Sequence, residues 1–211
     1  MPRAPRESLA DRRSRRAAVD DPADVLAAAA RFLGTRPRSA DEVRRRLRDT
    51  GYRADLVEGT LVRLTELGYL DDAAFARAWV ESRDRTRPRG ARALRDELRL
   101  KGVAPADVET ALAAREARES GDDPDDPRLV PGAGERAVSE ASDEAAAERL
   151  LARKGAGLLR EPDLRKRRAK AYGLLARGGF DPGTAGRAST AWLAKVGNMS
   201  TDEDTEPAAE P

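Results

Sequence analysis

The 211-residue sequence contains no cysteine and no histidine, and only 4% of its residues are aromatic. Without cysteine the chain has no disulfides, no thiolate zinc ligands and no thiol nucleophile. Without histidine it also lacks the usual general base and the commonest metal ligand. These absences argue against an enzyme, and the sequence predicts no catalytic residues, no metal site and no cofactor.

The sequence also lacks long apolar runs. No stretch approaches the roughly 18 residues of a membrane span, and residues 1–21 lack the apolar core of a signal peptide. The chain is therefore expected to be cytoplasmic and to have no membrane association. With 37% charged residues and abundant Ala, Leu and Arg, it can build small helical cores but not a thick sheet sandwich. The composition therefore predicts an all-α protein.

An internal repeat is the main positive feature of the chain. Three helix-compatible stretches end in a glycine followed by an apolar residue, at Gly51-Tyr52, Gly102-Val103 and Gly179-Phe180. The first two glycines are 51 residues apart and the last two 77 apart, and an acidic, Pro/Gly-rich insertion at 118–141 accounts for the difference. Because one such repeat cannot bury its own apolar face, the pattern predicts tandem helical modules stacked into an elongated body.

Local helix signals set the expected boundaries. Ser39 and Glu42 match a capping box, Asp71 or Asp72 fits a helix N-cap better than a metal ligand, and Gly178-Gly179 fits a helix end better than a phosphate-binding loop. The aromatic residues expected in the core, and not on a base-stacking surface, are Tyr52, Tyr69, Phe75, Trp79 and Phe180. The predicted organisation is a disordered leader at 1–22, three-helix modules at 23–67, 68–117 and 142–198, an acidic linker at 118–141 and a disordered acidic tail at 199–211.

Charge is strongly segregated along the chain, although the net charge is only +2. Basic residues outnumber acidic ones by 17 to 12 in residues 34–103 and by 12 to 3 in residues 149–198. Acidic residues dominate residues 119–148, by 10 to 2, and residues 199–211, by 5 to none. A basic folded body of this kind is attracted to polyanions. The alternative is that the arginines only solvate the helices of a highly charged protein.

The candidate binding residues are cations of the expected helices and loops. Five arginines from Arg83 to Arg92 surround an expected loop at 82–90, where they have no helical ion-pair ladder to serve, and this favours a binding role. The consecutive cations at 165–168 surround their helix, so they cannot all face one ligand. The full set of predicted filament or DNA contacts is Arg44, Arg45, Arg48, Arg83, Arg85, Arg87, Arg89, Arg92, Arg95, Arg99, Lys101, Arg165, Lys166 and Arg168.

Several short motifs lie at the predicted turns and in the helices beside them. They are Arg38-Ser39, Gly51-Tyr52, Gly68-Tyr69-Leu70-Asp71-Asp72 with Phe75 and Ala76, Arg89-Gly90 with Leu94 and Glu97-Leu98, Lys101-Gly102-Val103, and the run from Leu174 to Phe180. Together these motifs resemble the RecX family of RecA regulators, over about residues 23–195. The central block is the most specific part, because its two turns seldom occur together at this separation by chance.

The resemblance implies three tandem three-helix modules, a curved body and a non-enzymatic regulatory role. It implies that the protein lies in the groove of the RecA filament on DNA, inhibits ATP hydrolysis and strand exchange, and limits filament growth or promotes disassembly. The expected setting is DNA repair, recombination and the SOS response. The expected partners are the RecA filament and, weakly and without sequence preference, single- and double-stranded DNA, bound by a monomer.

Two other function classes stay open on the sequence alone. A helix-turn-helix-like DNA-binding regulator would hold a duplex through the arginines, as a dimer that binds operator DNA sequence-specifically. A helical scaffold would show no dependence on DNA. The sequence also leaves open whether the basic surface contacts DNA, RecA or both, and whether the acidic segment 119–148 folds over that surface.

Overall fold

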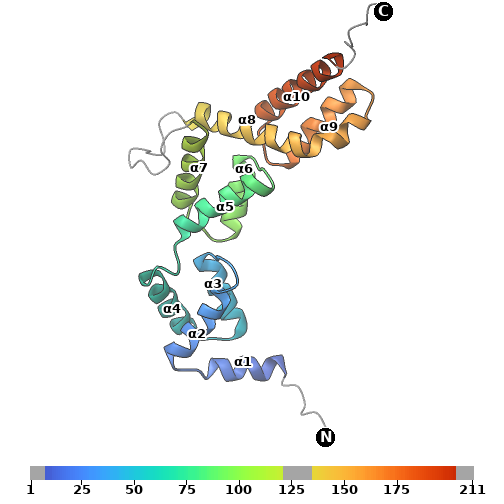
Figure 1. Cartoon of the computed structure of the whole chain (residues 1–211). Helices are drawn as coiled ribbons and strands as arrows, with labels where there is room; N and C mark the ends of the chain where they lie inside the picture. Colours follow the sequence, from blue (N-terminus) through green and yellow to red (C-terminus); the bar gives the residue numbers. More distant parts are fainter. Residues whose placement is uncertain (1–7, 121–134, 203–211) are drawn as a thin grey trace, which may run out of the picture. The chain divides into compact units, whose positions relative to one another are not determined.

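The computed structural model of the chain describes residues 8–120 and 135–202, with side chains described for 8–119 and 141–197. In these ranges the chain is built from α-helices and one short 3₁₀ helix, with no strand, which confirms the predicted all-α class (Figure 1). The elements are α1 (Leu9–Ala17), α2 (Pro22–Leu33), α3 (Ala40–Thr50), α4 (Ala54–Glu66), α5 (Asp72–Thr86), α6 (Ala91–Leu100), α7 (Pro105–Ser120), α8 (Glu135–Lys154), η1 (Gly155–Arg160), α9 (Leu164–Arg177) and α10 (Pro182–Asp202).

The chain forms two compact units, which are described one at a time. The described residues of the first unit lie within 1–76 and 98–108, and those of the second within 77–97 and 109–211. The division therefore falls inside α5, α6 and α7. None of the helices in the described ranges is long and apolar enough to cross a membrane.

The helix register reproduces the sequence repeat. α3 and α6 begin 51 residues apart, as do α4 and α7, and α10 begins 77 residues after α7. Gly51, Gly102 and Gly179 all have positive φ angles, of 109°, 76° and 83°. Glycine adopts this left-handed backbone without steric strain, so α3, α6 and α9 end in the same way and the predicted helix terminators are confirmed.

In the first unit, α2, α3 and α4 pack together and α1 packs against α3. The capping box predicted for α3 is present: Ser39 Oγ accepts a hydrogen bond from the Glu42 amide, and the Glu42 carboxylate accepts one from the Ser39 amide. Apolar residues at helical spacing bury one face of each helix, which is how such short helices gain stability. The core residues are Val25, Ala29, Val43, Leu47, Val57, Leu61, Leu64 and Leu70.

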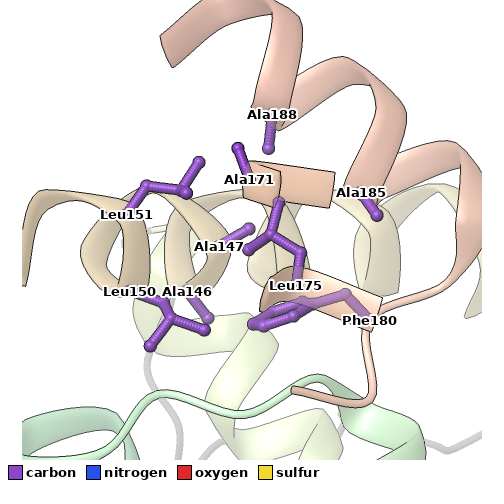
Figure 2. Packing of buried hydrophobic residues seen from close by; sticks show 9 residues of the cluster. All are labelled: Ala146, Ala147, Leu150, Leu151, Ala171, Leu175, Phe180, Ala185 and Ala188. Carbon is purple, nitrogen blue, oxygen red and sulfur yellow. The ribbon is translucent and has the colours of Figure 1, made fainter. Parts of the chain in front are cut away.

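In the second unit, α8, α9 and α10 surround a core that is rich in alanine. Figure 2 shows the nine side chains of this core, which come from these three helices and from the turn before α10. Small side chains let helix backbones approach closely, and the leucines and the phenylalanine fill the remaining space. The core residues are Ala146, Ala147, Leu150, Leu151, Ala171, Leu175, Phe180, Ala185 and Ala188.

The structure corrects several predicted boundaries. Residues 9–17 form α1, in a stretch predicted to be a disordered leader; none of its side chains is buried, so no apolar period marks it. α5 continues to Thr86 and takes up the first half of the expected loop at 82–90, while α7 and α8 extend into the expected linker. The rest of that linker (121–134), residues 1–7 and the tail after 202 lie outside the described residues.

One aromatic residue is not where the sequence places it. Phe75 and Phe180 are buried, Tyr52 and Trp79 are half-buried, but Tyr69 is 69% exposed. The preceding glycine, Gly68, has a φ of 73°, and after this turn it is Leu70, not Tyr69, that joins the core. The prediction that Tyr69 is a core residue is therefore wrong.

Candidate polyanion-binding surface

Several of the predicted contact residues have intramolecular ion-pair partners in the structure. A cation that already pairs with a carboxylate inside the chain has part of its charge neutralised and is less available to a ligand. The residues with such partners are Arg44, Arg45, Arg48, Arg83, Arg89, Arg95 and Lys101.

Two of these ion pairs occupy equivalent positions of the repeat. Arg44 Nε lies 3.1 Å from Glu58 Oε1, and Arg95 Nε and Nη2 each lie 2.9 Å from an oxygen of Glu109. Both residues of the second pair follow those of the first by 51 positions. The hydrogen bond from Arg44 lowers the pKa of Glu58, and the bond to Glu109 raises the pKa of Arg95. The pairs join α3 to α4 and α6 to α7.

Lys101 serves the first unit structurally. Its Nζ lies 3.0 Å from Glu42 Oε1, and both side chains are 15% exposed. Ser39 Oγ donates a hydrogen bond to the Lys101 carbonyl, and Arg45 Nη2 donates one to the carbonyl of Leu100. Although burial opposes it, the Lys101 ammonium holds the pKa of Glu42 below its ordinary value. These contacts fix the turn after α6 to the N-terminus of α3.

The two aspartates predicted as alternative N-caps accept hydrogen bonds from two different helices of the first unit. Asp71 Oδ1 accepts a hydrogen bond from the Ala74 amide at 2.8 Å and so caps α5. Asp72 accepts one from the Ala40 amide, in the first turn of α3, at 2.9 Å. Burial raises the pKa of Asp72. The interpretation of this pair as a helix cap is confirmed, with Asp71 in that role.

Contrary to expectation, Arg83 and Arg89 both form ion pairs with a carboxylate, that of Glu97. Arg83 Nε lies 2.7 Å from Glu97 Oε2 and its guanidinium stacks 4.2 Å from the ring centre of Trp79. Arg89 lies 3.5 Å from the other oxygen of Glu97 and also donates to the carbonyl of Arg177. The expectation fails because Glu97, 14 residues after Arg83, reaches both side chains from α6.

A cationic cluster remains at the end of α5. Arg85 and Arg87 are exposed, and within the described ranges their side chains form no hydrogen bond or ion pair. Arg153 Nη1 donates to the carbonyl of Thr86 at 2.9 Å, which places the last turn of α8, with Arg153 and Lys154, beside the last turn of α5. These four cations are called the α5–α8 cluster below. Arg153 and Lys154 escape the sequence prediction because only the tertiary contact between α8 and α5 brings them here.

The loop that follows α5 is held in place by tight packing. Gly90 N donates to the Gly178 carbonyl at 3.1 Å. A Cβ atom at Gly90 would lie 2.3 Å from the carbonyl oxygen of Gly179, closer than any normal contact. The loop therefore rests directly on the turn between α9 and α10, and Arg87 is carried by a fixed backbone.

A buried ionic network supports the same region. Arg115 on α7 is 2% exposed, and its guanidinium lies 3.1 Å from Asp84 and 2.9 Å from Asp143. The Asp143 carboxylate also accepts a bifurcated hydrogen bond from the Ala91 amide, whose nitrogen lies 3.0 Å from each of its two oxygens. Burial raises the pKa of Asp143, although Arg115 acts in the opposite direction. The network links α5, α6 and α7 to α8 within the second unit.

The remaining predicted cations lie on other exposed faces. Arg92 is exposed at the start of α6 and Arg99 near its end. Arg165, Lys166 and Arg168 are exposed on α9, and in the described part of the chain their side chains form no hydrogen bond or ion pair. No group of three or more acidic residues in the described ranges could hold a metal ion.

Family models and relatives identify the chain. The model for the first three-helix domain of RecX matches residues 26–64, and that for the second matches residues 71–112. The regulatory protein RecX of Thermobifida fusca is 35% identical over 158 residues, which are 74% of this chain and 72% of that protein. The chain belongs to the RecX family. It is thus related to regulatory proteins, as the resemblance implies.

Other comparisons within the RecX family are more local or concern the fold. The RecX of Prosthecochloris aestuarii is 43% identical over 81 residues, 38% of this chain and 54% of that protein, so the match spans about half the length of that relative. The crystal structure of RecX from Lactobacillus salivarius matches with a TM-score of 0.58 and 19% identity, covering 82% of this chain and 96% of that one. The structural match supports the helical fold.

The RecX domains divide the exposed cations. Arg85, Arg87 and Arg92 lie within the second matched domain, whereas Arg153 and Lys154 follow it. The α5–α8 cluster therefore combines residues of a recognised RecX domain with residues that only the tertiary structure brings to it.

Proposed function

We propose that this member of the RecX family regulates the RecA recombinase by binding the RecA filament on DNA, as a cytoplasmic monomer that catalyses no reaction itself. Its binding lowers ATP hydrolysis and strand exchange by RecA. The protein thereby acts in the control of DNA repair, recombination and the SOS response. The observation that carries the proposal is the α5–α8 cluster in a member of the RecX family.

The chemistry of the cluster fits a polyanionic partner. Arg85 and Arg87 break no intramolecular ion pair when they bind, so their full electrostatic gain goes to the ligand. The planar guanidinium group donates two parallel hydrogen bonds to a phosphate or a carboxylate. The cluster can therefore bind the DNA backbone in the filament, an acidic surface of RecA, or both, without reading a base sequence.

The test is the DNA-dependent ATPase of RecA on circular single-stranded DNA. The full chain is expected to lower the rate at less than one copy per RecA monomer, because a bound modulator acts on the polymer. Arg85→Ala/Arg87→Ala is expected to weaken inhibition. The matched control is Arg31→Ala/Arg63→Ala, which removes the same charge from exposed positions on α2 and α4. An unchanged ATPase with unchanged filament length would overturn the proposal.

The salt dependence of binding identifies the contacts. For single-stranded DNA each phosphate contact adds about 0.7 to the slope of log affinity against log salt, so losing two arginines should flatten the slope by about 1.4. Affinity and slope that match those of Arg31→Ala/Arg63→Ala would show that the cluster is only solvated. Tight, sequence-specific binding of a duplex by a dimer would instead favour a helix-turn-helix-like regulator.

A further inference from the structure

A groove of about 940 Å³ runs between α9 and α10 on the second unit. Leu164 and Tyr172 on α9 and Leu193 on α10 line it, and the first two are 65% and 38% exposed. None of its lining residues belongs to the core that α8, α9 and α10 share. The bundle is therefore complete without the groove, which leaves apolar side chains facing solvent.

The groove lies at a repeat position where the other repeats have an ion pair. In the second repeat Arg95 on α6 binds Glu109 on α7, and the first repeat has the equivalent pair between α3 and α4. A shift of 77 residues, the spacing of the last two repeat glycines, takes these positions to Tyr172 and Gly186. Both line the groove. The third repeat thus has a tyrosine and a glycine at the two positions where the other repeats have an arginine–glutamate ion pair.

Small residues line the groove where the two helices meet. They include Ala169, Gly186 and Ser189, and a Cβ atom added at Gly186 would meet nothing within 4 Å. The Ser189 hydroxyl donates to the Gly186 carbonyl at 3.0 Å, so it is already satisfied. Small residues let the backbone of another helix approach closely. From Leu164 to Tyr172, α9 spans about 12 Å, which matches roughly two turns of a guest helix.

The charge of the groove has one sign. Arg165 and Arg168 line it and are exposed, and neither side chain has a hydrogen bond or ion pair in the described ranges. No acidic residue is among the lining residues that the structure describes. Residues three apart lie on the same face of a helix about one turn apart. The groove therefore complements a guest that carries carboxylates one turn apart beside an apolar stripe.

We propose that this groove binds an acidic amphipathic helix of a protein partner. The apolar stripe of the guest packs against Leu164, Tyr172 and Leu193, and its carboxylates pair with Arg165 and Arg168. Single-stranded nucleic acid fits less well, because such sites use a track of cations and several stacking rings, whereas this groove has two arginines and one tyrosine. The proposal goes beyond the action on RecA and does not depend on it.

The experiment is a display selection of random 16-residue peptides on the full chain. The blocking variant is Gly186→Leu, which fills the groove and removes no core side chain. The matched control is Gly59→Leu, since a Cβ atom at Gly59 in the first unit also meets nothing within 4 Å. The charge variant is Arg165→Ala/Arg168→Ala. Thermal melts followed by far-UV circular dichroism check that each variant is folded.

Enriched peptides are expected to carry apolar residues at helical spacing flanked by Asp or Glu. Their affinity should fall by about tenfold or more with Gly186→Leu and with Arg165→Ala/Arg168→Ala, as for loss of a central interface contact, and stay unchanged with Gly59→Leu. No enrichment, enrichment without acidic residues, or equal binding to Gly186→Leu would overturn the proposal. So would binding of an oligothymidylate probe that Gly186→Leu abolishes, because the groove would then bind nucleic acid. None of these readouts involves RecA, so they fail separately from the ATPase test.

Discussion

Replacing Gly90 with alanine tests how the loop that carries Arg87 is held. The added methyl group would lie 2.3 Å, 2.5 Å and 2.6 Å from the Gly179 oxygen, the Gly179 carbonyl carbon and the Phe180 nitrogen. These are backbone atoms, which cannot rotate away as a side chain can. Overpacking of this kind costs about 1–3 kcal/mol, and loss of the Gly90–Gly178 hydrogen bond adds about 0.5–1.5 kcal/mol. The second unit should therefore lose about 1.5–4.5 kcal/mol of unfolding free energy.

Tryptophan fluorescence in a urea titration measures this effect selectively. The two tryptophans of the chain, Trp79 and Trp192, both belong to the second unit. For a domain of this size the expected loss moves the urea midpoint down by about 1 M or more. The control is Gly186→Ala in α10, where a methyl group meets nothing and should stabilise the helix by about 1 kcal/mol. If both variants shift the midpoint alike, the loop is not docked on the α9–α10 turn.

Two further predictions concern ion pairs. Arg115→Met removes one partner of a buried ion pair and leaves Asp143 buried without its cation. The second unit should therefore lose about 3–5 kcal/mol of unfolding free energy in the same urea titration. A change within about 0.5 kcal/mol would contradict a stabilising role for the network. The hydrogen bond from Arg44 lowers the pKa of Glu58 in the folded chain. The stability that this lowering gives is therefore fully present well above the ordinary pKa of a glutamate and is lost as the pH falls through the folded pKa. Far-UV circular dichroism melts from about pH 6 to pH 3 should therefore show a steeper loss for the parent chain than for Glu58→Gln. Parallel losses would contradict this.

Features that depend on neighbouring residues could be predicted from the sequence. The Ser39–Glu42 capping box and the three repeat glycines are local signals, because a cap or a left-handed turn is decided within about four residues. Each of them appears in the structure as expected. The capping box of α1, formed by Ser8 and Asp11, is an equally local signal, but without buried residues in the helix it carries no apolar period to support it.

The ion-pair partners of the arginines could not be predicted in this way, because they come from other helices and depend on the tertiary structure. The pairs Arg44–Glu58, Arg83–Glu97 and Arg95–Glu109 each span 14 residues across a helix connection, beyond the reach of a helical ion-pair pattern. One signal was nevertheless available. Arginine and glutamate at the same separation recur one repeat period apart in the first two repeats, which is what a structural pair would produce. The position of Arg153 beside Thr86 has no such signal, because nothing local connects α8 with α5.

Comparing equivalent positions of the three repeats distinguishes arginines that form structural ion pairs from residues that form a binding surface. The Arg–Glu pairs of the first two repeats join side chains that are each at least a third exposed, so each pair is worth at most about 1 kcal/mol. Their absence from the third repeat therefore costs little stability. Exposed apolar side chains clustered in a groove are, by contrast, typical of interaction sites on soluble proteins. With Tyr172 and Gly186 in place of an ion pair, the third repeat lacks a weak contact and has a surface suited to a partner. We therefore expect Gly186→Leu to change peptide binding much more than it changes the free energy of unfolding.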